Sequence, residues 1–235
     1  MKKILITGFS HCGTTILRCI IGHIADVYEV VDETPIVRSK ITNEFDKTYN
    51  YILIKSPQAN ETFFTSYYND YIKIFIIRNP LWVYSSINRR TNYNITPLHY
   101  FDKYVNSCKL FLKYKDMGLP NCYFIRYEDM FENNYKNLKT IFDNIGFKYT
   151  DDIFDNSKYV NKSHSIIKIN KNDLSGNKIT DAQHQLYRNW QVNEPFENNN
   201  TIDKLDLSDK QIQQIISNQY INLIYPNIHY PINKT

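Results

Sequence analysis

The chain has 235 residues, of which 42% are hydrophobic, 15% aromatic and 22% charged, a composition typical of a globular protein and not of a disordered one. Its net charge of +4 is too small to favour a nucleic-acid partner, and no apolar run reaches the roughly 18–20 residues that a membrane span requires. We therefore expect a single domain over residues 1–235, with a core at 1–150 and a helical and loop elaboration at 151–235.

The four cysteines form no C-x-x-C pair and have no spacing typical of metal ligands, which favours reduced thiols in the cytoplasm. The segment Met1–Ile6 resembles the start of a signal peptide, but the segment Gly8–Gly13 interrupts it before any cleavage region. We interpret this start as a first strand. No feature of the sequence predicts an oligomeric state.

Five short β-like runs recur along the first half of the chain, separated by segments with helical patterns. The runs are Lys3–Thr7, Val27–Val31, Tyr51–Lys55, Ile72–Ile77 and Cys122–Arg126. Strands that alternate with helices predict βαβ crossovers and a mostly parallel sheet. We therefore predict an α/β fold of three layers, with a five-stranded sheet between helices on both faces, similar to the P-loop nucleotide hydrolases.

Helical spacing of apolar residues predicts three further helices. One covers Pro97–Lys115 and a second covers Asp129–Ile145, where Gly146 is the expected C-cap. Ser208 is the expected N-cap of a third, which extends to about Leu223. Between these, the pattern is weaker: Tyr159–Gly176 is polar and favours a loop, Asp181–Trp190 favours a helix, and 197–200 favours a surface loop.

The segment Gly8–Thr15 lies between the first strand and an apolar helical run. Its spacing is that of a Walker loop, G-x-x-x-x-G-K-[ST], except that Thr14 replaces the lysine. Such a turn directs backbone N–H groups and the positive end of a helix dipole at one point, where a phosphate can bind. A tight turn that only feeds a buried helix is the structural alternative.

The other strand ends argue against a nucleoside triphosphatase. The third strand ends in Lys55-Ser56-Pro57 and the fourth in Arg78-Asn79-Pro80, so both ends are cationic and neither supplies a carboxylate for magnesium. An amide cradle with cations and no metal carboxylate suits a polyanionic donor that needs no metal. We therefore expect no metal site.

Together these motifs resemble those of sulfotransferases that use 3′-phosphoadenosine-5′-phosphosulfate (PAPS). The family's first loop, [KR]-S-G-T-T, is matched by His11-Cys12-Gly13-Thr14-Thr15, and its R-D-P-x-x-x-x-x-S motif by Arg78–Ser86. A tyrosine-glutamate-aspartate motif that closes the family's last strand is matched within Arg126–Asp129. The three motifs occur in the family's order over residues 4 to about 146, and their joint match is more specific than any one of them.

The resemblance implies where the donor binds. The residues that it places around PAPS, or around its product 3′,5′-adenosine bisphosphate (PAP), are Ser10, His11, Cys12, Gly13, Thr14, Thr15, Arg78, Ser86 and Lys178. Gly13 to Thr15 would hold the 5′-phosphosulfate end, and Arg78 with Ser86 would hold the 3′-phosphate. Pro80 is well placed to start a helix that brings Arg78 and Ser86 to one anion. Lys178, 12 residues before Trp190, has only a partial likeness to a cofactor-covering region of the family.

The resemblance also implies the catalytic groups. Cytosolic members carry a histidine base after the third strand, but this chain has Lys55-Ser56-Pro57-Gln58 there and no histidine. The segment Asp32-Glu33-Thr34 instead resembles the G-E-E-T segment of tyrosylprotein sulfotransferases, which makes Glu33 the expected base. Lys55 matches the lysine that stabilises the transferring sulfuryl group in those enzymes. The structural alternative for Glu33 is an acidic pair at a helix start, and that for Lys55 is a solvated surface charge.

His11 is the main departure, because the family has a lysine or arginine there. A histidine supplies a cation only when it is protonated. Three interpretations stay open: protonated His11 donates to the bridging oxygen, Lys55 performs that task alone, or activity is weakened. A fourth interpretation is that His11 is a turn residue without a role. The expected function is transfer of a sulfuryl group from PAPS to a hydroxyl of a carbohydrate, small molecule or tyrosine. A P-loop kinase and a non-catalytic, nucleotide-binding relative are the alternatives.

Overall fold

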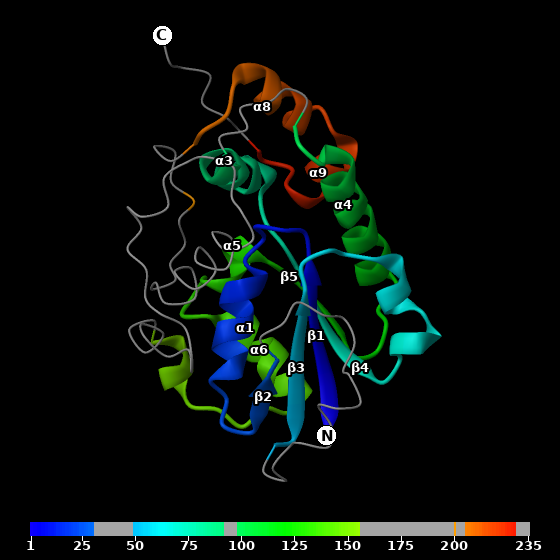
Figure 1. Cartoon of the computed structure of the whole chain (residues 1–235), viewed down its shortest axis with the longest axis vertical. Helices are drawn as coiled ribbons and strands as arrows, with labels where there is room; N and C mark the ends of the chain where they lie inside the picture. Colours follow the sequence, from blue (N-terminus) through cyan, green and yellow to red (C-terminus); the bar gives the residue numbers. More distant parts are fainter. Residues whose placement is uncertain (31–48, 92–97, 156–199, 201–204, 229–235) are drawn as a thin grey trace.

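A computed structural model describes residues 1–30, 49–91, 98–155, 200 and 205–228. Its centre is one five-stranded sheet in the order β2-β3-β1-β4-β5, and every strand pairing in it is parallel (Figure 1). The strands are β1 (Lys2–Gly8), β2 (Val27–Glu29), β3 (Tyr51–Ser56), β4 (Tyr71–Ile77) and β5 (Cys122–Arg126). All five lie within two residues of the expected positions at each end, so the predicted strands are confirmed.

The central strands are apolar on both sides. Ile4, Leu5 and Ile6 of β1 are all fully buried, although neighbouring side chains of a strand point to opposite faces. A parallel strand with helices on both faces gives this unbroken apolar run. The sheet is therefore the middle of three layers, as the sequence predicts.

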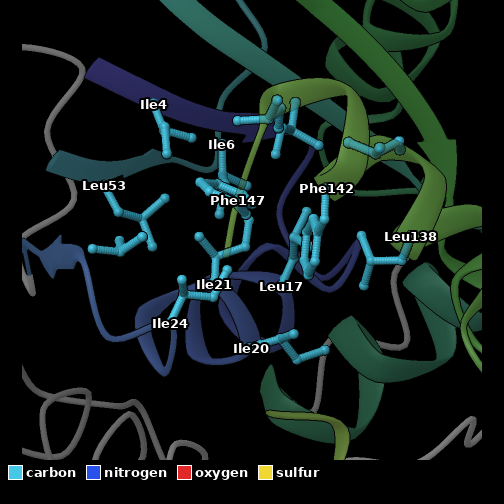
Figure 2. Close-up of a cluster of buried hydrophobic side chains, with 14 of the residues drawn as sticks. Ile4, Ile6, Leu17, Ile20, Ile21, Ile24, Leu53, Leu138, Phe142 and Phe147 are labelled. Atoms are coloured by element: carbon cyan, nitrogen blue, oxygen red, sulfur yellow. The ribbon is translucent and has the colours of Figure 1, made fainter. Parts of the chain in front are cut away.

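One face of the sheet is covered by α1 (Thr14–Gly22) and α6 (Lys136–Ile145). Figure 2 shows their shared core, in which Leu17, Ile20 and Ile21 of α1 meet Ile4 and Ile6 of β1 and Phe142 of α6. Positions 17, 20 and 21 follow the helical period of apolar residues, so α1 presents one apolar stripe to the sheet. Each fully buried side chain of this kind contributes about 1.5–3 kcal/mol.

The opposite face packs against helices from both halves of the sequence. These are α3 (Pro80–Thr91), α4 (Phe101–Asp116), α8 (Asp209–Ile216) and α9 (Gln219–Ile224). Phe75 and Ile77 of β4 enter their common core together with Tyr104 of α4. Two 3₁₀ turns, η1 (Glu61–Phe64) and η2 (Ser66–Tyr68), cover Leu5, Ile52 and Ile54 on the same side. Helices thus cover both faces, which confirms the predicted α/β class.

Two predicted helices are interrupted. The expected helix at Asp129–Ile145 consists of α5 (Tyr127–Met130) and α6, and the turn between them contains Asn133, Asn134 and Tyr135, all at positive φ. Left-handed backbone cannot continue a right-handed helix, so the chain must restart. Gly146 is the left-handed C-cap of α6, as predicted. A final short 3₁₀ turn, η3 (Asp151–Phe154), follows.

The expected C-terminal helix at Ser208–Leu223 is also two helices, α8 and α9. Ser208 caps α8 as predicted, in a capping box with Gln211, whereas Asn218 caps a new helix by accepting bonds from the N–H groups of Tyr220 and Ile221. A second N-cap therefore divides the segment. The loop expected at 159–176 and the helix expected at 181–190 lie outside the described residues. No helix in the described ranges is long and apolar enough to cross a membrane.

Candidate active site

The candidate active site lies where the carboxyl ends of β1, β3, β4 and β5 meet. The loop after β1, Lys55 at the end of β3, Arg78 after β4 and Glu128 after β5 all belong to this edge. Ligands of open parallel sheets bind at this edge, because the loops that follow neighbouring strands converge there. The topology therefore gathers the three motifs that the sequence separates by more than a hundred residues.

Gly13 shapes the loop that begins α1. Its φ is 90°, in the left-handed region, and a Cβ added there would lie 2.4 Å from the ring of Tyr127. The position therefore requires glycine for its backbone angle and for the close approach of that ring. No side chain caps the start of α1 and no acidic residue lies in its first turn. The first N–H groups of a helix have no partner within the helix, so this end suits an anion.

Ser10 and Cys12 hold the loop from two sides. The Ser10 hydroxyl donates to the carbonyl of Pro57, 3.4 Å away, and so links the loop to the segment after β3. Cys12 is fully buried, and burial raises the pKa of its thiol to about 12. A thiol that stays protonated is a packing group and not a nucleophile.

Lys55 brings a cation to the start of α1. Its side chain is almost fully buried, and its ammonium donates to the Thr15 hydroxyl at 2.9 Å. In a Walker loop, the lysine comes from the loop itself, at the position that Thr14 occupies in this chain. Here a lysine reaches the same helix start from the neighbouring strand.

Arg78 is held on several sides. Its Nε and Nη2 atoms donate to Oδ1 of Asn200 at 3.1 and 2.6 Å, and Nη1 donates to the carbonyl of His11 at 3.4 Å. The guanidinium also lies 4.3 Å from the ring centroid of Tyr127, a cation–π contact. This arginine is therefore fixed at the sheet edge and is not a freely solvated strand cap.

Ser86 and His11 meet beside Arg78. Pro80 begins α3, and the Asn79 side chain caps it by accepting from the N–H of Leu81 at 3.0 Å. Ser86 lies about two turns into this helix, and its hydroxyl is 2.9 Å from Nδ1 of His11. The His11 backbone has a positive φ of 66°. The structure thus joins the first motif to the second through their side chains.

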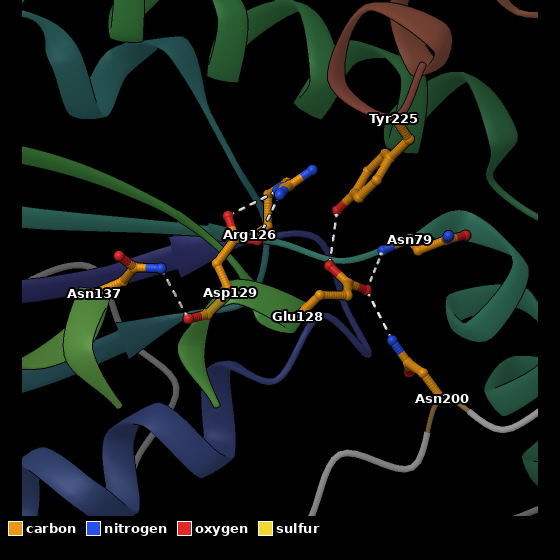
Figure 3. Close-up of polar contacts among 7 residues, drawn as sticks. All are labelled: Asn79, Arg126, Glu128, Asp129, Asn137, Asn200 and Tyr225. Atoms are coloured by element: carbon orange, nitrogen blue, oxygen red, sulfur yellow. Dashed lines mark hydrogen bonds and ion pairs between the residues drawn. The ribbon is translucent and has the colours of Figure 1, made fainter. Parts of the chain in front are cut away.

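Glu128 is the acidic centre of the edge (Figure 3). Its Oε1 accepts from the N–H of Asn79 and from Nδ2 of Asn200, both at 2.9 Å, and its Oε2 accepts from the Tyr225 hydroxyl at 3.3 Å. Burial raises the pKa of this carboxyl, and the bonds from Asn79 and Asn200 and the charge of Arg78 oppose that shift. Among the described residues, no three His, Cys, Asp or Glu side chains group in a way that could hold a metal ion.

Comparison with known proteins gives structural matches only. No protein family model matches the sequence, and no curated protein is significantly similar to it. Retinol dehydratase with androsterone and inactive cofactor PAP superposes with a TM-score of 0.53 at 14% identity, over 98% of this chain and 84% of that protein. Retinol dehydratase with retinol and PAP gives 0.50 at 13% identity, with the same coverage. The chain has the fold of these sulfotransferase-like enzymes.

Mouse sulfotransferase SULT7A1 with PAP also matches, with a TM-score of 0.44 and 21% identity over 63% of this chain and 60% of that protein. These similarities concern the sulfotransferase fold alone.

Within this fold, the structure brings together most of the residues that the sequence predicts. Ser10 to Thr15, Lys55, Arg78 and Ser86 share the one edge, whereas Glu33 and Lys178 lie outside the described residues. The sequence did not indicate roles for Glu128 or Asn200. The tyrosine-glutamate-aspartate motif was a signal for Glu128, but Asn200 falls in an asparagine-rich segment that only suggested a surface loop.

Proposed function

We propose that the protein is a PAPS-dependent sulfotransferase, which moves a sulfuryl group from PAPS to a hydroxyl of a carbohydrate, a small molecule or a tyrosine. The observation that carries this proposal is the bond from Lys55 to Thr15. It supplies a cation to the loop without the loop lysine that a nucleoside triphosphatase uses. The donor's 5′ end then needs no metal for charge compensation.

The residues present suit an anionic donor. The uncapped start of α1, which follows the left-handed backbone of Gly13, provides a backbone cradle for the 5′-phosphosulfate. Arg78, with the Ser86 hydroxyl nearby, would hold the 3′-phosphate, because a planar guanidinium grips phosphate through paired N–H groups. Lys178 is proposed as a further donor contact on the basis of the sequence alone.

The proposed chemistry is one displacement at sulfur. The acceptor oxygen bonds to sulfur as the bond from sulfur to the 5′-phosphate oxygen breaks, and PAP leaves. Glu33 accepts the proton of the acceptor hydroxyl, and Lys55 stabilises the negative charge that develops on the sulfuryl group and the leaving phosphate. We assign the cation to Lys55 because the His11 ring contacts Ser86, on the side of Arg78.

The test is transfer of radioactive sulfur from labelled PAPS to a panel of sugars, phenols, alcohols and tyrosyl peptides, in buffer with EDTA. The wild type should label at least one acceptor class, and labelling should continue in the chelator. Failure of every acceptor, together with magnesium-dependent transfer of phosphate from ATP, would identify a kinase. Tight PAP binding without any transfer would overturn the catalytic part and leave a nucleotide-binding protein.

A further inference from the structure

The peptide group that follows Arg78 is fixed at both of its polar atoms. The carbonyl of Arg78 accepts from the Tyr104 hydroxyl at 2.6 Å, and the N–H of Asn79 donates to Glu128 at 2.9 Å. Tyr104 is fully buried in α4, so its hydroxyl is held by the surrounding core. The main chain at Arg78 therefore cannot rotate without the loss of two hydrogen bonds.

The side chain of Arg78 is fixed through the same carboxylate. Oε1 of Glu128, which accepts from the N–H of Asn79, also accepts from Nδ2 of Asn200 (Figure 3). Oδ1 of Asn200 in turn accepts from Nε and Nη2 of the Arg78 guanidinium. The amide orientation of Asn200 follows from this arrangement, because its NH₂ faces a carboxylate and its oxygen faces a cation. Oε1 of Glu128 thus fixes the backbone at Asn79 directly and the guanidinium of Arg78 through Asn200.

The amide between Glu128 and Arg78 has an electrostatic consequence. A carboxylate in direct contact with the guanidinium would neutralise it and compete with a phosphate, whereas an amide oxygen orients it without a formal charge. A guanidinium has five N–H donors. Asn200 takes one on Nε and one on Nη2, and His11 takes one on Nη1, so the contacts with described residues leave one donor on each terminal nitrogen. Such a pair suits a phosphate.

We infer that Asn200, held by Glu128, is a positioning residue that orients Arg78 and so determines selectivity for a 3′-phosphorylated nucleotide. The inference rests on the proposed function, because the 3′-phosphate is that of PAPS. Asn200 acts through Arg78 and not on the nucleotide. Its removal should therefore weaken the preference for the 3′-phosphate and leave the rest of nucleotide binding in place.

Calorimetric titration with PAP and with adenosine 5′-monophosphate, which lacks the 3′-phosphate, tests this. In Asn200→Ala, the affinity for PAP should fall about tenfold while that for the monophosphate stays within about twofold, a loss typical of coupled polar groups. Asn137→Ala is the matched control, because Asn137 also donates to a neighbour, the Asp129 carbonyl, but is not part of the chain of hydrogen bonds from Glu128 to Arg78. This control should keep the wild-type ratio of the two affinities.

The outcomes separate the inference from the proposed function. A wild type that binds PAP no better than the monophosphate would contradict the proposed function at this site. If the wild type prefers PAP and Asn200→Ala keeps or increases that preference, the positioning role is wrong. An increase would mean that Asn200 competes with the phosphate for Arg78.

Glu128 variants provide a second test, which can still be read if Asn200→Ala does not fold. Glu128→Gln keeps an oxygen for Asn79 and Asn200, so its PAP preference should stay within about threefold of wild type, whereas Glu128→Ala should lose about tenfold. Combining Glu128→Ala with Asn200→Ala should add little further loss, since both act through one path. Independent, additive losses, or an unchanged preference in a folded Glu128→Ala protein, would refute the link.

Discussion

The imidazole of His11 lies 2.9 Å from the hydroxyl of Ser86, although the two residues belong to different motifs, 75 positions apart. The carbonyl of His11 also accepts from Arg78. Nδ1 and the carbonyl of His11 thus both contact residues of the second motif. Lys55 contacts Thr15 at the start of α1 instead. The two cationic candidates therefore contact different parts of the edge, and we propose that Lys55 is the one that stabilises charge at sulfur.

His11→Asn should keep kcat within about threefold between pH 6 and 8, because asparagine tolerates positive φ and places a polar nitrogen near the position of Nδ1. The measurement is the pH profile of sulfuryl transfer with an acceptor identified in the panel. A drop of about a hundredfold or more, with a wild-type profile that falls as His11 deprotonates, would show that protonated His11 is the donor. The variant His11→Arg offers a complementary check, because a permanent cation should not raise turnover if Lys55 alone carries this role.

Lys55→Met should lower kcat by about 10²–10³-fold, because the cation that stabilises the transition state is removed while the side-chain volume is kept. PAP affinity should change much less than kcat. Lys73→Met is the matched control: Lys73 is a buried strand lysine, but it lies near the amino end of β4, and burial lowers its pKa. Its replacement should leave kcat unchanged. Equal kcat losses in both variants would point to a general folding defect.

Gly13→Ala should destabilise the protein by more than about 2 kcal/mol and abolish the response to PAP, because it adds a clash with the Tyr127 ring to a left-handed backbone. Gly118→Ala separates the two causes. Gly118 also has a positive φ, 58°, but nothing lies within 4 Å of an added Cβ. It should cost only about 1 kcal/mol. Urea unfolding measures both, and similar losses would show that the Tyr127 contact is unimportant.

Glu128 should make stability depend on pH in a defined direction. Burial raises its pKa above the ordinary value of 4.5. A raised carboxyl pKa means that the folded state favours the protonated form, so this group's contribution is fully present below about pH 4.5 and is lost as the pH rises through the raised value. Glu128→Gln should therefore be more stabilising, relative to wild type, at pH 7 than at pH 4. Urea melts at the two pH values test this, and the opposite order would contradict the sign.

The strands and the layer order follow from the sequence because buried parallel strands are short apolar runs with turn residues at their ends. The helix breaks do not, because the backbone at 133–135 is left-handed although no glycine or proline occurs there. The division of the C-terminal helix at Asn218 is similar. An asparagine within a helical pattern does not by itself predict an N-cap, because the cap depends on which backbone N–H groups its side chain binds.

The site was predictable where parallel topology alone decides it. Lys55 lies at the end of β3 and Arg78 follows β4, the two parallel strands on either side of β1, so both had to reach one edge of the sheet. Asn200 contacts Arg78 across 122 positions, and no local pattern encodes such a contact. The contact between Ser86 and His11 could not be predicted either, because it depends on the direction of the side chains and not on the order of the motifs. Glu33 as the base and Lys178 as a donor contact stay predictions.

The most direct test of metal-free PAPS binding is the melting temperature of the wild type with PAP in EDTA, compared with ATP and magnesium. A ligand that binds only the folded state raises its stability through mass action, so saturating PAP should raise the melting temperature by several degrees without any metal. ATP with magnesium should have little effect. Stabilisation by ATP and magnesium without any response to PAP would contradict the account.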